Sequence, residues 1–170
     1  MNFVHLKEWS PMEKLSLILW RERELLDTLL FKLETEQLVL AGGRTRWLAR
    51  SAREVEIVLD QLRKTEILRA AAADEAAEDV GLDSNPSLRA LAESIGEPWR
   101  TIMLDHRDAF VTITREITEL ADANRHLITS GYRSARETLL TLGDDAVDSY
   151  SPDGSAVVTA PARRRVDRSL

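Results

Sequence analysis

Two heptad-patterned stretches that meet at the pair Gly42-Gly43 constrain the fold of this chain more than any other feature. Apolar residues recur in both stretches at three- and four-residue spacing, which places them on one face of a helix. Both stretches are longer than an ordinary globular helix, and so short a loop leaves room only for an antiparallel return. A third stretch, about 98–142, continues the same spacing. The chain is therefore predicted to be all-α.

Capping signals set the limits of the first two predicted helices. Ser10 can cap a helix that has Pro11 in its first turn, and this helix is expected to end at Gly42 in a left-handed cap. The second helix is predicted over about 45–80. Its alanine-rich part, 70–77, offers little side-chain bulk, so we expect that end to pack weakly and to be mobile.

The rest of the chain is predicted to add a short helix, a long helix and a tail. Breaker residues leave a short helix over 87–95, and proline in a first turn opens the long helix 98–142, which runs unbroken unless Gly131 kinks it. We therefore expect an elongated antiparallel hairpin packed on a long C-terminal helix, with three long helices and one short one. Residues 1–142 form the predicted bundle domain. Residues 143–170 form a flexible tail, because they cannot bury enough apolar surface to offset their ordering entropy.

The chain is large enough for a hydrophobic core. It has 170 residues, of which 44% are hydrophobic, and this suffices for one domain. The predicted core consists of residues on the widest apolar face of each long helix: Leu26, Leu29, Leu33, Val55, Leu59, Leu62, Phe110, Ile113 and Ile117.

Composition argues against several partners and compartments. The net charge of −6 disfavours nucleic acid, whose binding draws on clustered Lys and Arg. There is no cysteine for a disulfide framework or a thiolate metal site. The start of the chain has charged residues where a secretion signal needs an apolar core, and no apolar run approaches membrane-span length. We expect a cytoplasmic protein without membrane insertion.

No catalytic or cofactor-binding constellation is predicted. Helical bundles that hold two metal ions use Glu-x-x-His, but neither His106 nor His126 follows a glutamate at that spacing. Both histidines are interpreted as surface residues or as core residues with satisfied hydrogen bonds. There is no glycine-rich phosphate loop. We therefore expect no enzyme activity, no cofactor and no metal.

Polar and aromatic residues near the seams leave two interpretations each. Asn124 lies among the apolar residues of the third predicted helix. There it either fixes the register of a coiled coil that the chain forms with itself, or marks the point at which this apolar face meets water and an incoming partner. Trp20, Trp47 and Trp99 lie beside charged residues and are expected to pack at helix junctions, or else to offer their N–H groups to a partner.

The helical region resembles the FlgN family of flagellar export chaperones over about residues 12–142. The segments that carry the resemblance include Leu19-Trp-Arg-Glu-Arg-Glu-Leu-Leu26, Gly43-Arg-Thr-Arg-Trp-Leu48, Pro98-Trp-Arg-Thr101 and Ala135-Arg-Glu-Thr-Leu-Leu140. The resemblance implies a non-catalytic cytoplasmic chaperone. Its partners would be hook-associated proteins, whose helical termini it keeps from self-association, and the flagellar type III export gate, to which it brings them.

The family's client contact is associated with the C-terminal helical part, which corresponds here to about 113–142. The candidate client-binding residues are Ile117, Leu120, Asn124, Leu127, Ile128, Gly131, Ala135, Leu139 and Leu142. An apolar stripe longer than its intramolecular partners can cover would stay exposed and mark an interaction site, whereas a stripe that they do cover would only extend the core. A free chain could hide it in a homodimer or under its tail. The alternative function is a self-associating coiled-coil scaffold without an export role.

Overall fold

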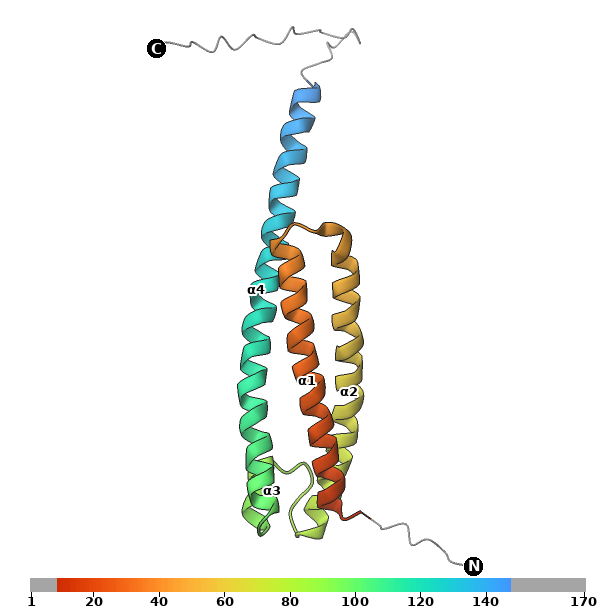
Figure 1. Ribbon diagram of the computed structural model, residues 1–170, viewed down its shortest axis with the longest axis vertical. Helices are drawn as coiled ribbons and strands as arrows, with labels where there is room; N and C mark the ends of the chain where they lie inside the picture. Colours follow the sequence, from red (N-terminus) through yellow and green to blue (C-terminus); the bar gives the residue numbers. More distant parts are fainter. Residues whose placement is uncertain (1–8, 148–170) are drawn as a thin grey trace, which may run out of the picture. The chain divides into compact units, whose positions relative to one another are not determined.

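The computed structural model describes residues 9–147 and, for side chains, residues 9–142. This part of the chain is helical and contains no β-strand, so the all-α prediction is confirmed. The elements, shown in Figure 1, are α1 (Pro11–Ala41), the 3₁₀ turn η1 (Thr45–Trp47), α2 (Leu48–Asp79), α3 (Leu88–Ser94) and α4 (Trp99–Val147).

The start of α1 is fixed by a capping box, in which Ser10 is the cap residue that the sequence indicated. The Glu13 backbone N–H donates to Ser10 Oγ at 3.2 Å, and the Ser10 backbone N–H donates to Glu13 Oε2 at 2.9 Å. Pro11 takes the first helical position, where its missing N–H costs nothing. Two backbone N–H groups at the start of α1, which have no acceptor within the helix, are thus hydrogen-bonded to side chains.

The turn after α1 is a Schellman motif centred on the second glycine of the pair. The Arg44 N–H donates to the Val39 carbonyl at 3.0 Å, and the Gly43 N–H donates to the Leu40 carbonyl at 3.1 Å. Gly43 has φ of +62°, whereas Gly42 has φ of −80°. The prediction that Gly42 takes the left-handed conformation was wrong, because this motif needs positive φ one residue beyond the cap.

Ion pairs between α1 and α2 confirm that the two helices are antiparallel. Residues later in α1 pair with residues earlier in α2. The three pairs are Lys14–Glu75 (3.4 Å), Glu22–Arg69 (2.9 Å) and Lys32–Glu54 (2.8 Å). Glu22 is the most buried of these side chains. Its burial raises the pKa of the Glu22 carboxyl, while the Arg69 guanidinium lowers it.

The lower core lies at the end of the bundle where α1 begins. Its buried members come from α1, α2, α3 and α4: Met12, Leu15, Leu19, Ala72, Ala76, Leu91, Ala92 and Met103. Ala76 is fully buried, so the expectation that the alanine-rich part of α2 packs weakly was wrong. Ala72 and Ala76 thus join side chains of α1, α3 and α4 in one buried cluster.

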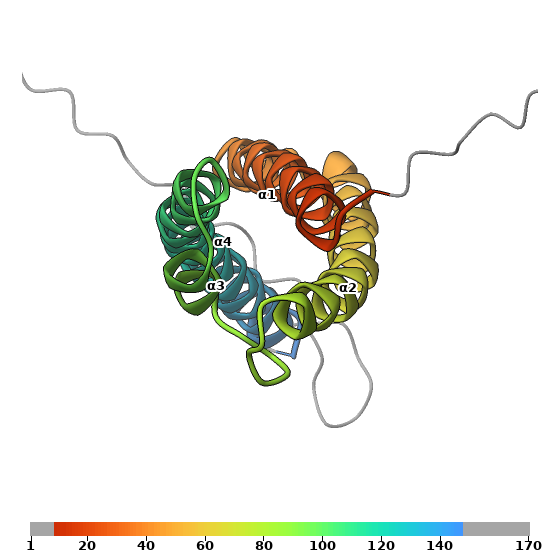
Figure 2. The same cartoon turned by 90° about the horizontal axis from the view of Figure 1, so that it is seen from below.

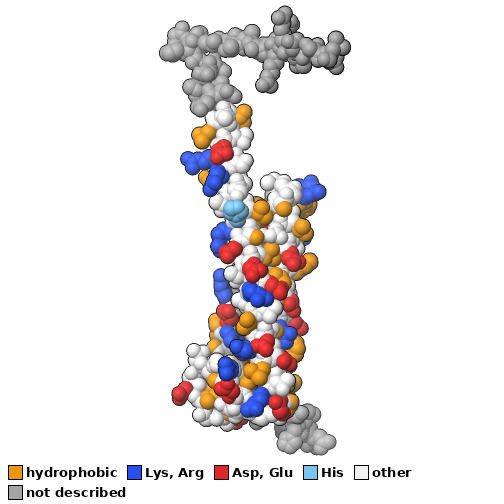
Figure 3. All heavy atoms as spheres, turned by 90° about the vertical axis from the view of Figure 1, so that its left-hand side faces the viewer, with side chains coloured by type: hydrophobic (Ala, Val, Ile, Leu, Met, Phe, Trp, Pro, Cys, Tyr) orange, Lys and Arg blue, Asp and Glu red, His pale blue; other side chains and the backbone are white. Residues whose placement is uncertain are grey.

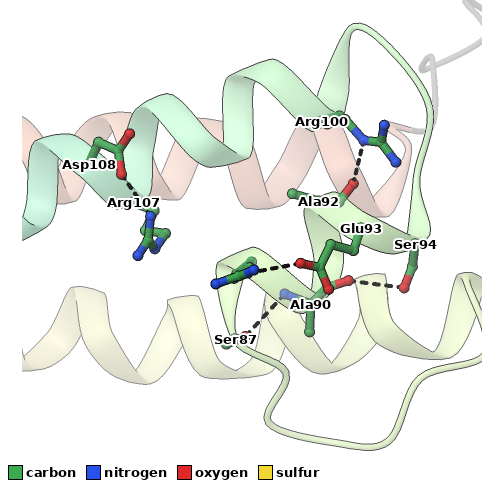
Figure 4. Close-up of polar contacts among 9 residues, drawn as sticks. Ser87, Ala90, Ala92, Glu93, Ser94, Arg100, Arg107 and Asp108 are labelled. Atoms are coloured by element: carbon green, nitrogen blue, oxygen red, sulfur yellow. Dashed lines mark hydrogen bonds and ion pairs between the residues drawn. The ribbon is translucent and has the colours of Figure 1, made fainter.

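Helix α3 lies between α2 and α4 at this end of the bundle (Figures 2 and 4). Ser87 Oγ caps it by accepting from the Ala90 N–H at 3.1 Å, and Leu91 is fully buried. Arg100 Nε at the start of α4 donates to the Ala92 carbonyl at 3.2 Å, as Figure 4 shows. The short helix is thereby tied to the helix that follows it.

The upper core is built from α1, α2 and α4 without α3. Its buried members are Leu25, Leu29, Leu33, Val58 and Leu62, and its partly buried rim contains Leu26, Val55, Leu59, Ile117, Leu120 and Ala121. Seven of the nine predicted core residues belong to this cluster or its rim, whereas Phe110 packs on the lower core. Ile113 is half-buried. The residues of the lower core were almost entirely absent from the predicted core.

Helix α4 is longer than predicted. It continues through Gly131 and past Gly143, where the sequence analysis ended it, to Val147. A single glycine costs a helix only about 1 kcal/mol, and the next proline, Pro152, lies farther along the chain. The predicted tail is therefore helical over its first residues, and from residue 148 onward it lies outside the described residues. The chain divides into two compact units, residues 1–127 and 128–170, so α4 contributes to both.

Candidate binding surface on the long helix

The part of α4 that belongs to the first unit is held against the hairpin by an apolar stripe. Ile117 and Leu120, two predicted client-binding residues, are half-buried in the rim of the upper core. Leu127, the last residue of this unit, is also half-buried. Ile117 and Leu120 pack on the chain's own hairpin, so they form part of the core rather than an open surface.

Asn124 joins α4 to the far end of α1. Only 2% of this residue is exposed, and its Nδ2 donates to the Leu33 carbonyl at 2.9 Å and to Glu36 Oε2 at 3.1 Å. A buried amide that bonds to one carbonyl and one carboxylate defines how two helices align. Asn124 therefore fixes register, as one of the two interpretations held, but it does so within the bundle rather than between chains.

The remaining predicted residues lie in the second unit, where every side chain from Ile128 to Leu142 is exposed. Leu139 is 70% exposed and Leu142 is 61% exposed. A Cβ added at Gly131 would meet nothing within 4 Å. Large apolar side chains rarely stay this open in a row along a helix without a partner.

The apolar residues of this unit share one helix face. Their spacing alternates four and three residues, and we call the set Ile128, Tyr132, Ala135, Leu139 and Leu142 the C-terminal stripe. Tyr132, 70% exposed, was missed by the sequence analysis, although the same spacing identifies it. The predicted residue Gly131 lies beside the stripe and lowers the helix surface there.

Charged residues flank the C-terminal stripe. Arg133, Arg136 and Glu137 are all exposed, and no ion pair within residues 9–142 involves either arginine. Figure 3 shows basic and apolar side chains interspersed on this part of the helix. Such a surface can bury leucines against a partner while arginines at its edge contact acidic groups.

His106 differs from its predicted state. It is 1% exposed, its ring lies edge-on to Trp20 with centroids 4.8 Å apart, and neither ring nitrogen has a hydrogen-bond partner among the described residues. Burial, assisted by the Arg23 guanidinium, lowers the pKa of His106 to about 4, while Asp105 opposes the shift. The expectation of a surface or satisfied histidine was wrong for His106, whereas His126 is exposed as expected.

The tryptophans are only partly junction residues. Trp99, at the start of α4, packs against the lower core, and Trp47 lies in the turn between α1 and α2 with the Arg46 guanidinium 5.1 Å from its ring centroid. Trp20 instead lies within α1, half-exposed, with Arg23 at 4.6 Å from the centroid of its ring. Its ring covers His106 rather than a junction.

Two features are absent from the part of the chain that the structure describes. Between residues 9 and 142, no group of three or more His, Asp and Glu side chains is arranged to hold a metal ion. No helix in the part of the chain that the structure describes is both long and apolar enough to cross a membrane.

Comparison with known proteins gives one family. The model of the family described as FlgN protein matches residues 12–157, which is most of the chain. No match was found among the curated proteins or among the solved structures.

Proposed function

This chain belongs to the FlgN family of flagellar export chaperones, and from that membership we propose that it binds a helical terminus of a hook-associated protein. In this proposal the chaperone acts in the cytoplasm without catalysing a reaction. It keeps the client terminus from self-association and delivers the client to the export gate of the flagellar type III system.

The exposed C-terminal stripe is the observation that carries the choice of surface. It presents two leucines, an isoleucine and a tyrosine on one face of an already formed helix. A client helix can lay its own apolar face along such a surface, the usual mode in which an amphipathic helix is recognised. Because the receiving helix is already formed, little ordering entropy is lost on its side.

The candidate site is smaller than the sequence analysis expected. Ile128, Gly131, Ala135, Leu139 and Leu142 remain in the proposal, and Tyr132 joins them. Four predicted residues are withdrawn as direct contacts because none of them is fully exposed: Asn124 is buried, and Ile117, Leu120 and Leu127 are half-buried. Their role in the proposal is to hold the bundle together.

The test compares two neighbouring leucines of similar exposure. Leu139 belongs to the C-terminal stripe, whereas Leu140 is 61% exposed but lies about 100° away around the helix. Burial of one leucine contributes about 1.5–3 kcal/mol, so Leu139→Asp should weaken client binding by about tenfold or more. Leu140→Asp is the matched control, and it should change affinity much less.

Binding is measured by titration calorimetry against purified hook-associated proteins, with circular dichroism to verify the fold. An equal loss of binding in both variants would mean that the client contacts another surface, or that the Asp substitutions disrupt the helix. If the Leu139→Asp variant binds the client as tightly as the parent does, the C-terminal stripe is not the binding surface.

A further inference from the structure

The turn between α1 and α2 is strongly basic in a chain that is acidic as a whole. Residues 37–53 contain no Asp, Glu or Lys, whereas the net charge of the chain is −6. The segment has four arginines, all of them exposed: Arg44, Arg46, Arg50 and Arg53. Figure 1 shows that this turn closes one end of the hairpin. The positive charge is therefore concentrated at that end.

The two glutamates that border this segment leave most of its charge unpaired. Glu36 is 9% exposed and is hydrogen-bonded within the bundle. Glu54 is paired with Lys32 at 2.8 Å and with Arg50 at 3.2 Å. Among residues 9–142, no ion pair involves the other three arginines, Arg44, Arg46 and Arg53. These three guanidinium groups are available to an anionic partner.

Large apolar side chains are exposed at the same end of the hairpin. Leu38, in the last turn of α1, is 74% exposed, and Trp47, in η1, is 43% exposed. All residues from 41 to 47 are exposed, so the turn stands out from the bundle instead of lining a groove. We call residues 38–47 the hairpin tip.

Backbone donors of the hairpin tip are already hydrogen-bonded within it. The N–H groups of Gly42, Gly43 and Arg44 donate to carbonyls of the last turn of α1, and the Trp47 N–H donates to the Arg44 carbonyl at 2.9 Å. A free N–H group loses its bonds to water when it enters a less polar medium, which is unfavourable. The hairpin tip can leave bulk water without that loss at these four groups.

We propose that the hairpin tip docks on the surface of an anionic lipid bilayer. Arginine pairs with phosphate groups in two-pronged contacts, and tryptophan favours the headgroup region, where its ring meets apolar groups and its N–H meets polar ones. Stable docking on a membrane surface usually needs an apolar and a basic signal together, and the hairpin tip has both. The docking is peripheral, and it does not depend on the client or on the C-terminal stripe.

The separation of charge along the hairpin favours one orientation on such a surface. Acidic residues are concentrated at the other end of α2, where residues 74–83 contain Asp74, Glu75, Glu78, Asp79 and Asp83. From Leu48 to Asp74 the helix spans about 39 Å, whereas charges are screened over about 10 Å at 0.1 M salt. A negative surface at the hairpin tip therefore attracts the arginines and hardly repels these acidic residues.

Vesicle flotation of the full-length protein tests the docking. The vesicles contain equal parts of phosphatidylglycerol and phosphatidylcholine, and vesicles of phosphatidylcholine alone serve as the reference. One arginine near an anionic membrane strengthens binding about fivefold, so Arg44→Gln and Arg46→Gln together should weaken it about 25-fold. The matched control combines Arg63→Gln and Arg115→Gln, which remove the same charge at exposed positions outside the hairpin tip. This control should bind nearly as well as the parent.

The apolar part of the docking has a control pair of its own. Leu38→Ser should weaken vesicle binding about tenfold or more, because the leucine no longer enters the headgroup region. Leu68→Ser changes a leucine of α2 that is 59% exposed but lies outside the hairpin tip, and it should have little effect. Raising the salt from about 0.1 M to about 1 M should release the protein, since screening shortens from about 10 Å to about 3 Å. Circular dichroism verifies that every variant is folded.

Several results would overturn the proposal. They are a lack of binding to the phosphatidylglycerol vesicles, equal losses in the tip variants and their controls, and full binding by Leu38→Ser. Soluble polyglutamate and a single-stranded oligonucleotide are added as competitors. If either binds the parent and the Leu38→Ser variant equally and displaces both from the vesicles, the hairpin tip recognises an acidic protein segment or a nucleic acid instead of a membrane.

Discussion

Residues 99–127 and residues 128–142 belong to one helix and share one apolar spacing, yet they differ in what they bury. The first part contributes Met103, His106 and Asn124 to the interior, each at most 2% exposed. The second part has no buried side chain. Apolar periodicity therefore indicates which face of a helix seeks a partner, but not whether the partner belongs to the same chain.

The largest expected contrast comes from truncating an apolar side chain in each part of α4. Met103 is fully buried in the lower core, so Met103→Ala should lower the free energy of unfolding by about 2–5 kcal/mol. Leu139→Ala should change it by less than about 0.5 kcal/mol, because the side chain is exposed. Urea unfolding followed by circular dichroism measures both. Similar losses in the two variants would break the comparison.

Acidification should affect the buried part of α4 through His106. The unfolded chain takes up this proton near pH 6.5, but in the folded protein the pKa of His106 is about 4. Stability from this group is therefore complete above about pH 6.5 and is lost as the pH falls toward about 4, by up to about 3 kcal/mol. Unfolding free energies near pH 7 and near pH 4 should differ less in His106→Leu than in the parent. An unchanged difference would contradict the burial of this ring.

Asn124 is the last buried residue of α4 among the described side chains. Its replacement by alanine should lower the free energy of unfolding by more than the small size of the side chain suggests. Asn124→Ala leaves the Leu33 carbonyl and the Glu36 carboxylate without their buried donor, which typically costs about 1–3 kcal/mol. The neighbouring variant Arg125→Ala, at an exposed position, serves as the control. Equal and small effects in thermal unfolding would mean that Asn124 does not hold α4 to α1.

The smallest expected effect lies in the exposed part. Gly131 is helical and has open space around it, so Gly131→Ala should stabilise the local helix by about 1 kcal/mol. Hydrogen exchange of residues 128–142 should slow accordingly. If the same variant weakens client binding, Gly131 allows a partner helix to approach closely. If binding is unchanged, Gly131 does not have that role.

Local signals in the sequence were sufficient to predict much of the fold. Ser10, Pro11 and Ser87 act through neighbours only a few residues away, so the helix starts could be identified without tertiary information. The lower core could not be predicted, because Ala72 and Ala76 become core residues only where side chains of α1, α3 and α4 gather with them. Gly143 could not be recognised as helical for a related reason: one glycine weakens a helix without determining where it ends.

The candidate surface was predictable in part. The three- and four-residue spacing located the correct helix and included Leu139 and Leu142, but it could not separate them from Ile117 and Leu120. That distinction depends on where α1 and α2 end in space, which periodicity does not encode. The burial of His106 was also unpredictable, since it arises from the packing of Trp20 across from it.

The ion pair between Glu22 and Arg69 limits slippage of the hairpin. Leucines recur at nearly every turn of α1, so apolar contacts alone would tolerate a shift of α1 along α2 by one turn, about 5.4 Å. Such a shift would separate the Glu22 carboxylate from Arg69 while leaving it enclosed, and an unpaired buried charge costs about 3–5 kcal/mol. We expect this one polar contact to select a single alignment among several that the leucines would accept.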